Sequence, residues 1–173
     1  MSLLVKLARR LIVAVIAAVA LAGSALVWRE LAHSEPAPAV SYTLLDGRKG
    51  STASLRGKVL LVNFWATSCT SCVAEMPHIV TTHNKFKNRG YDTLAVAMSY
   101  DPPALVARFA ESRQLPFGVA IDNSGEIAKR FGDVHLTPTT FLIDKRGNIV
   151  KRYVGAPDFA ALQQLIDKLL ADA

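Results

Sequence analysis

The apolar residues of the chain form short continuous runs and helical repeats, separated by Gly, Pro, Asn and Asp. Continuous runs predict strands that are buried on both faces, and two of them cover residues 58–66 and 91–98. Shorter runs predict strands over residues 117–121, 139–143 and 148–154. Apolar residues that recur every three or four positions predict helices over residues 72–86, 103–113 and 124–131, and a final helix capped by Asp158.

An initial hairpin precedes these elements, with an Asp46-Gly47 turn between residues 42–45 and 50–53. We predict that Ser124 caps the helix that follows it, and that Pro77 kinks its helix because proline has no N–H to donate. Strands that alternate with helices form a sheet with helices packed on both faces. The predicted fold class is therefore α/β, with a mixed central sheet.

Residues 11–28 carry no charge and follow a basic segment, residues 1–10. This length lies within the roughly 17 to 25 residues that span a bilayer as a helix. Two interpretations stay open: a transmembrane anchor, or a cleaved signal peptide with a small-residue site at Ala20-Leu21-Ala22. The anchor is favoured because the apolar run continues past that site to Trp28. Because positive charges stay inside, both interpretations place the rest of the chain outside the cytoplasm.

The remainder of the 173-residue chain has the length of one domain. We predict a proline-containing linker over residues 29–40 and a single domain over residues 41–173. The net charge is +6, of which +3 comes from residues 1–33. Because no later basic stretch is interleaved with aromatic residues, we predict no nucleic-acid partner.

Cys69 and Cys72 are the only two cysteines, and they stand between the buried strand over residues 58–66 and the helix after it. Two thiols exclude a framework of several disulfides and a four-cysteine zinc site. A strand that delivers a Cys-x-x-Cys pair to the first turn of a helix is typical of a redox site. Two inert core cysteines, or half of a metal site, remain the alternatives.

Two further motifs accompany the cysteines: Phe64-Trp65-Ala66 before them, and Thr137-Pro138-Thr139-Thr140-Phe141 at a later strand. With these motifs the chain resembles the thioredoxin fold, and more closely the membrane-anchored thiol-disulfide reductases of the TlpA and ResA type. The resemblance spans about residues 40–171, including the N-terminal β-hairpin and an inserted strand and helix.

The resemblance implies an extracytoplasmic thiol-disulfide oxidoreductase without a cofactor, working as a reductase on protein disulfides. It implies a monomer anchored in the bacterial inner membrane with its catalytic domain in the periplasm, or released to the periplasm if the N-terminus is cleaved. A membrane redox partner would recycle the dithiol, and cytochrome c maturation is one process that such a protein supports.

Cys69 is expected at a helix N-terminus, where free backbone N–H groups and the helix dipole favour a thiolate. A thiolate attacks disulfides, so Cys69 is the predicted nucleophile and Cys72, one turn on, the resolving thiol. The oxidised pair forms the disulfide Cys69–Cys72.

Two positions depart from the family pattern. Ser68 stands where the family usually has Trp, and Ser71 where it often has Pro. The hydroxyls of Thr70 and Ser71 can donate hydrogen bonds toward the Cys69 thiolate, which lowers its pKa. The reduction potential and the direction of electron flow therefore stay open.

A resolving thiol must lose its proton, so a nearby base matters. In thioredoxin an Asp on the preceding strand does this work, and here that position is Asn63, which cannot titrate. Glu75 follows Cys72 by three residues on the same helix face, in a Cys-x-x-Glu-x-Pro pattern similar to that of the TlpA and ResA type. We hypothesise that burial raises the pKa of Glu75 and that it takes the Cys72 proton. A first-turn Glu stabilised by the helix dipole is the alternative.

Thr137-Pro138 resembles the family's cis-proline loop, which packs against the cysteines. The resemblance implies a cis bond that leaves the Thr137 backbone free to pair with an extended substrate. It also implies that Pro138 keeps a metal from bridging the thiols. Trp65, close to the cysteines, completes the predicted substrate-binding residues.

Two other functions stay open. Cys69, Cys72 and His135 could hold copper, as in copper-delivery proteins of this fold, whereas His78 and His83 are predicted at the surface or at its boundary with the core. A thiol peroxidase of similar fold is the second alternative, disfavoured because the expected Thr-x-x-Cys surroundings are not matched.

Overall fold

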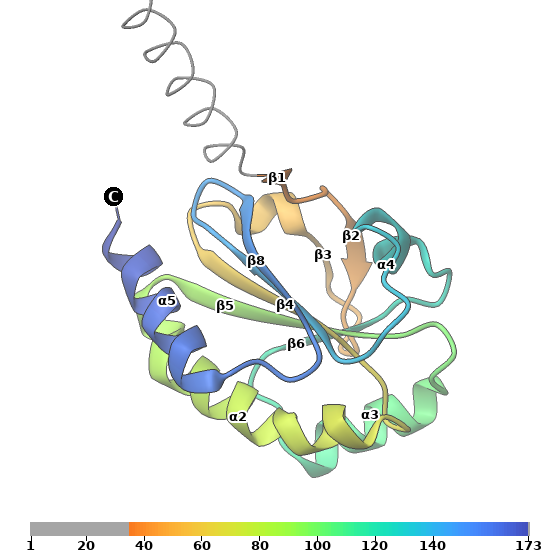
Figure 1. Ribbon diagram of the computed structural model, residues 1–173. Helices are drawn as coiled ribbons and strands as arrows, with labels where there is room; N and C mark the ends of the chain where they lie inside the picture. Colours follow the sequence, from red (N-terminus) through yellow and green to blue (C-terminus); the bar gives the residue numbers. More distant parts are fainter. Residues whose placement is uncertain (1–34, 173) are drawn as a thin grey trace, which may run out of the picture. The chain divides into compact units, whose positions relative to one another are not determined.

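The computed structural model describes residues 35–172, so the predicted anchor over residues 11–28 lies outside the described part. Figure 1 shows its strands and helices. In chain order they are β1 (Glu35–Pro36), β2 (Ser41–Thr43), β3 (Lys49–Ser51), η1 (Thr52–Leu55), β4 (Val59–Trp65), α2 (Thr70–Phe86), η2 (Lys87–Arg89), β5 (Tyr91–Ala97), α3 (Pro103–Ser112), β6 (Gly118–Ile121), α4 (Glu126–Arg130), β7 (Thr139–Ile143), β8 (Asn148–Val154) and α5 (Phe159–Ala171). None of the helices within residues 35–172 is long and apolar enough to cross a membrane.

Six strands form the main sheet in the order β1-β8-β7-β4-β5-β6, and β2 and β3 form a separate hairpin. Strands β4, β5 and β6 are parallel, whereas β7 is antiparallel to both of its neighbours. The predicted mixed sheet is confirmed. All residues of the central strand β4 are buried, as its continuous apolar run predicts.

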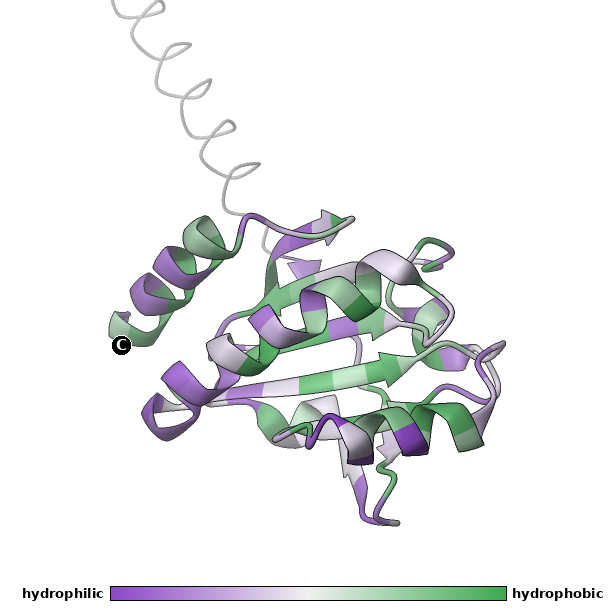
Figure 2. Cartoon of the chain, turned by 90° about the horizontal axis from the view of Figure 1, so that it is seen from below, coloured by the Kyte–Doolittle hydropathy of each residue, from purple (hydrophilic) through white to green (hydrophobic). Residues whose placement is uncertain are grey.

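Alternate residues of β4 face two separate apolar cores. Leu61 and Trp65 lie in the core formed with α2, α3 and α5. Leu60, Val62 and Phe64 lie in the other core, formed with α4 and the hairpin. Figure 2 shows helices with alternating hydrophobic and hydrophilic bands packed beside mainly hydrophobic strands. Helices therefore cover both faces of the sheet, as predicted.

Helix α4 is shorter than predicted, and the prediction that Ser124 caps it is wrong. The N-cap is Gly125, with φ at 74°, and Ser124 makes only a 3.4 Å hydrogen bond to the first residue of the helix. The buried carboxylate of Asp122 instead accepts hydrogen bonds from the N–H groups of Ile127 and Ala128, at 3.1 and 2.8 Å. A side chain from the end of β6 thus satisfies the first turn.

Residues 35–40, which the sequence assigns to a linker, pack on the domain. Strand β1 pairs with β8 and extends the sheet by one edge strand. Val40 is 2% exposed, and its N–H donates to Thr52 Oγ1 at 3.0 Å. The single apolar Val40 fills the core beneath the hairpin, which fixes this part of the chain.

Candidate active site at the start of helix α2

The two cysteines lie at the start of helix α2. Cys69 is the N-cap, so the helix begins two residues earlier than predicted, and it continues through Pro77. The sulfurs form the disulfide Cys69–Cys72, with the Cα atoms 5.2 Å apart. Cys72 is fully buried, whereas Cys69 is half-buried. Cys69 is therefore the sulfur that a partner protein can reach.

Hydrogen-bond donors surround the Cys69 sulfur. The backbone N–H of Cys72 donates to Cys69 Sγ at 3.2 Å, and the Ser71 hydroxyl lies 3.4 Å from it. The free N–H groups of the first helical turn add a positive potential. This environment favours a thiolate at Cys69 once the disulfide is reduced.

Glu75 is buried one turn further along α2. Its side chain is 3% exposed, and Oε1 accepts a hydrogen bond from Asn63 Nδ2 at 2.9 Å. Burial raises the pKa of Glu75 from 4.5 to about 7, and the Asn63 hydrogen bond opposes part of that rise. The predicted direction of the shift is confirmed. The alternative of a first-turn Glu stabilised by the helix dipole does not fit, because the first turn of α2 holds no acidic residue.

Asn63 connects Glu75 to strand β7. Its Nδ2 also donates to Thr140 Oγ1 at 2.9 Å, and both Asn63 and Thr140 are buried. The sequence alone indicates no role for Thr140, although the residue belongs to the Thr137–Phe141 motif. Its side-chain contact depends on the β4–β7 register, which the motif alone does not reveal.

The Thr137–Pro138 peptide bond is cis, as the resemblance implies. Strand pairing places Thr139 opposite Phe64, so the loop lies beside the end of β4 that leads to the cysteines. Around the loop, Leu136 is 66% and Tyr100 58% exposed, and the Tyr100 and Thr137 hydroxyls lie 3.4 Å apart. Exposed apolar side chains thus flank the predicted substrate-binding loop.

Asp101 is hydrogen-bonded to Thr67, which lies between strand β4 and the cysteines. The sequence alone did not indicate this contact. The carboxylate is 2% exposed and accepts hydrogen bonds from Thr67 N–H at 2.6 Å and from Thr67 Oγ1 at 2.5 Å. The available signal was its place just after β5, since the ends of the parallel strands β4 and β5 meet at one edge of the sheet.

The structure does not support substrate binding by Trp65. Its side chain is fully buried and packs on Phe109 of α3, with the ring centroids 5.1 Å apart. The alternation of β4 turns Trp65 into the core beneath the helices, so the prediction of a surface contact is wrong.

The three histidines within residues 35–172 lie in different environments. His78 is exposed as predicted, but the prediction that His83 lies at the surface or at its boundary is wrong because the residue is buried, with 5% exposed. His135 is exposed, and its Nε2 lies 3.3 Å from an Asp133 carboxylate oxygen. Within residues 35–172 no group of three or more His, Cys, Asp or Glu side chains could hold a metal ion. The structure therefore does not bring His135 and the two cysteines together as a copper site.

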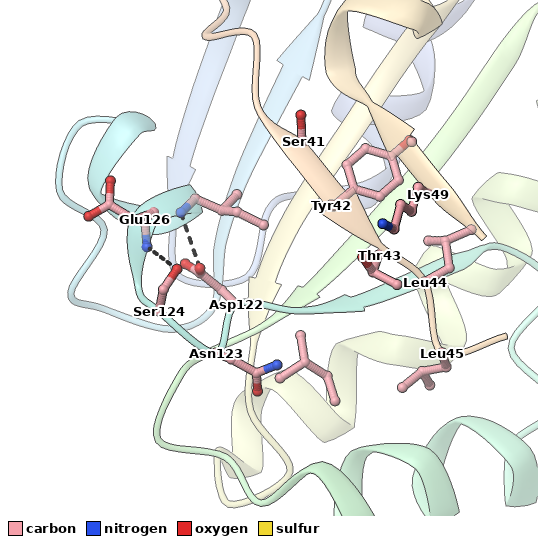
Figure 3. A pocket seen from close by; sticks show the side chains of 13 residues that line it. Ser41, Tyr42, Thr43, Leu44, Leu45, Lys49, Asp122, Asn123, Ser124 and Glu126 are labelled. Atoms are coloured by element: carbon pink, nitrogen blue, oxygen red, sulfur yellow. Dashed lines mark hydrogen bonds between the residues drawn. The ribbon is translucent and has the colours of Figure 1, made fainter. Parts of the chain in front are cut away.

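An open pocket lies away from these residues, between the β2–β3 hairpin and the β6–α4 turn (Figure 3). It encloses about 840 Å³, and its lining mixes apolar side chains such as Leu44 with polar ones such as Lys49 and Glu126. No cysteine lines it. The position of the two sulfurs, and not the size of a pocket, therefore identifies the redox site.

Comparison with known proteins finds related sequences and structures. The family model described as Redoxin matches residues 32–166. The thiol-disulfide oxidoreductase ResA of Bacillus thuringiensis is 35% identical over 133 residues, which cover 77% of this chain and 76% of that protein. The Bacillus subtilis protein of the same name is 33% identical over 124 residues, covering 70% and 68%.

Solved structures show the same fold. A candidate thioredoxin from Neisseria meningitidis is 44% identical, with a TM-score of 0.75, over 81% of this chain and 93% of that one. A thiol:disulfide interchange protein of the thioredoxin family from Chlorobium tepidum is 29% identical, with a TM-score of 0.74, over 81% and 99%.

Proposed function

The chain belongs to the Redoxin family and is a thiol-disulfide oxidoreductase, and on this basis we propose that it acts as a membrane-anchored, extracytoplasmic disulfide reductase. The observation that supports this best is the unequal exposure of the two sulfurs, half-buried at Cys69 and fully buried at Cys72. The Cys69 sulfur is accessible to a partner protein, whereas the buried Cys72 sulfur is accessible only to Cys69. This arrangement suits disulfide exchange through a mixed disulfide, because one thiol meets the substrate and the other resolves the bond.

Cys69 begins the reaction in the reduced protein. Its thiolate attacks one sulfur of the substrate disulfide, forms a mixed disulfide and releases the other substrate sulfur as a thiolate. The N-terminal N–H groups of α2 and the Ser71 hydroxyl stabilise the Cys69 thiolate before the attack.

Cys72 then resolves the mixed disulfide. Its thiol transfers a proton to the Glu75 carboxylate, and the new thiolate attacks Cys69 Sγ. The bond from Cys69 to the substrate breaks, the second substrate thiolate leaves, and the Cys69–Cys72 disulfide forms. The substrate has gained two electrons. The pKa of Glu75 is about 7, and a carboxylate with a pKa near the ambient pH can both accept and release this proton.

Substrate recognition is assigned to the cis-proline loop. An extended substrate segment pairs with the backbone of Thr137, and Pro138 holds that segment beside Cys69. The exposed side chains of Leu136 and Tyr100 offer apolar contacts on either side. The partners are proteins with accessible disulfides.

The location and recycling of the enzyme complete the proposal. The apolar residues 11–28 with the basic residues 1–10 support an inner-membrane anchor and a domain over residues 41–173 in the periplasm. A membrane protein with a dithiol returns two electrons to the Cys69–Cys72 disulfide. The protein acts as a monomer, and the resemblance to the TlpA and ResA type favours a role in cytochrome c maturation.

Trapping the mixed disulfide tests the proposal. The full-length Cys72→Ala variant, expressed in a bacterial envelope, should accumulate adducts with its substrates because the resolving thiol is gone. We expect reducible adducts on a non-reducing gel, with partners identified by mass spectrometry. The Cys69→Ala/Cys72→Ala double variant is the control and should form none. Adducts that persist in the double variant, or none in Cys72→Ala, would contradict the proposal.

A further inference from the structure

The amide of Asn63 and the carboxyl of Glu75 form a buried pair that lacks one hydrogen bond. One contact exists, from Asn63 Nδ2 to Glu75 Oε1 at 2.9 Å. Within residues 35–172 only three buried side-chain nitrogen or oxygen atoms have no hydrogen-bond partner, and two of them are Asn63 Oδ1 and Glu75 Oε2. Buried polar atoms without a partner are rare and costly, so two in one pair require an explanation.

Both atoms are acceptors as long as Glu75 is ionised. Two acceptors cannot form a hydrogen bond with each other, and an unpaired polar atom is costly in a buried site where electrostatic effects are strong. A single proton on Glu75 Oε2 changes this, because the acid O–H can donate to Asn63 Oδ1. The pair then has two hydrogen bonds, N–H to Oε1 and O–H to Oδ1, as in an amide–carboxylic acid dimer.

Thr140 decides which way the amide of Asn63 points. Asn63 and Thr140 are direct partners in the antiparallel β4–β7 pairing, and both side chains are buried. Thr140 Oγ1 accepts the second hydrogen of Asn63 Nδ2 at 2.9 Å. With both N–H bonds directed to Glu75 and Thr140, the amide oxygen is left for the acid proton.

We propose that Asn63, oriented by Thr140, is the positioning residue that holds the proton taken up by Glu75 in the oxidised enzyme. The inference rests on the proposed function, in which Glu75 accepts the Cys72 proton. It adds that the proton stays on Glu75 Oε2, bonded to Asn63 Oδ1, until a dithiol partner reduces the disulfide. Two electrons from that partner then break the Cys69–Cys72 bond, and the stored proton returns to the Cys72 sulfur.

Within residues 35–172, no charged side chain contributes to the shift of the Glu75 pKa. The influences on the Glu75 pKa are its burial, which raises it, and the Asn63 hydrogen bond, which lowers it. Strand β4 contributes Asn63 and strand β7 contributes Thr140, neither of which ionises. On α2 the titratable groups nearest in sequence to Glu75 are Cys72, the proton donor of the proposal, and His78, each three residues away. The side chain of His78 is exposed, whereas Glu75 is buried.

The Thr140→Val variant tests the role of the hydroxyl. Valine has nearly the same shape and suits a strand, but without an acceptor the amide can turn both N–H groups toward the Glu75 carboxylate. We expect the Glu75 pKa in the oxidised full-length chain to fall by about one unit, as measured by carbon-13 NMR of its carboxyl group. Thr140→Ser keeps the hydroxyl and should restore the wild-type pKa. An unchanged pKa in Thr140→Val would overturn the proposal.

Infrared spectroscopy of the wild-type chain provides a second test that needs no folded Thr140 variant. The Glu75 band is the one that disappears in Glu75→Gln. Below the Glu75 pKa it should show a carboxylic acid that both donates and accepts a hydrogen bond. A band typical of an acid whose O–H donates to nothing would contradict the role of Asn63 Oδ1.

The outcome can be separated from that of the proposed function. If Glu75→Gln leaves the pH dependence of mixed-disulfide resolution unchanged, Glu75 is not the proton acceptor and the proposed function fails at that step. If Glu75→Gln alters that dependence but Thr140→Val matches the wild type in both the Glu75 pKa and the pH profile, only the positioning role fails.

Discussion

Helix α2 buries Glu75 near its start and His83 near its end, and these two side chains have opposite hydrogen-bonding environments. Near the start, Glu75 is 3% exposed and has one hydrogen bond, from Asn63, while its second oxygen has no partner. Near the end, His83 is 5% exposed, and its Nδ1 lies 3.1 Å from Thr93 Oγ1. Thr93 in turn donates to the hydroxyl of Tyr91 at 3.2 Å. Glu75 therefore keeps one buried oxygen without a hydrogen-bond partner, whereas the buried His83 is hydrogen-bonded to its neighbour.

Burial acts on both pKa values by favouring the neutral form. It raises the pKa of Glu75 to about 7 and lowers that of His83 below its usual 6.5. The His83 ring packs against the rings of Tyr91 and Phe117, an environment that suits the neutral form. Glu75 instead lies one turn from a redox-active cysteine. Burial of a titratable group is therefore not evidence of chemistry by itself, whereas an unsatisfied group beside a reactive thiol is.

The largest expected effect is on stability in Glu75→Gln. Because the folded pKa of Glu75 is raised, its contribution to stability is fully present below pH 4.5 and is lost as the pH rises through about 7. Glutamine does not ionise and can form the same two hydrogen bonds with Asn63. By pH 8.5 the variant should exceed the wild type by on the order of 3 kcal/mol, measured by urea unfolding of the oxidised full-length chain. A difference that stays constant between pH 5 and 8.5 would contradict the assignment.

The contribution of His83 to stability should depend on pH in the opposite direction to that of Glu75. The lowered pKa of His83 means that its contribution is present above pH 6.5 and is lost as the pH falls. His83→Leu removes the bond to Thr93 and should cost about 1 kcal/mol at pH 7.5. The cost should shrink at pH 5, where the wild type is itself weakened.

Urea unfolding at the two pH values measures this change. His78→Gln is the matched control, since His78 is exposed on the same helix and stacks on Phe159. If His83→Leu lowers the free energy of unfolding equally at pH 5 and 7.5, the pKa of His83 does not differ between the folded and unfolded states.

The smallest effect concerns the thiolate itself. Ser71→Ala removes the hydroxyl that lies 3.4 Å from Cys69 Sγ, so the Cys69 pKa in the reduced chain should rise by about 0.3 to 0.5 unit. The pH dependence of alkylation by iodoacetamide measures the pKa. Ser68→Ala, at an exposed neighbouring serine, should change it less. Equal shifts in the two variants would mean that the Ser71 hydroxyl has no specific role.

Local patterns were enough for most elements of the fold. The bounds predicted for β7 and β8 agree with the structure, and Asp158 caps α5 through hydrogen bonds to Ala160 and Ala161. These features depend on residues close in sequence: apolar runs, a turn and a capping side chain. Strand β1 was not predicted because two residues carry no periodic pattern, and only their pairing with β8 makes them a strand.

The sequence by itself determined the redox chemistry, because two cysteines at the start of a helix and a Thr-Pro motif are local signals. It also indicated that burial raises the pKa of Glu75. Only the tertiary structure decided which side chains surround that carboxyl and the approach to the cysteines. Asn63 and Thr140 meet because β4 and β7 pair in one register, and Asp101 reaches Thr67 because β4 and β5 end side by side. The same packing placed Trp65 and His83 in the core, because the direction of a side chain depends on the neighbours of its strand or helix.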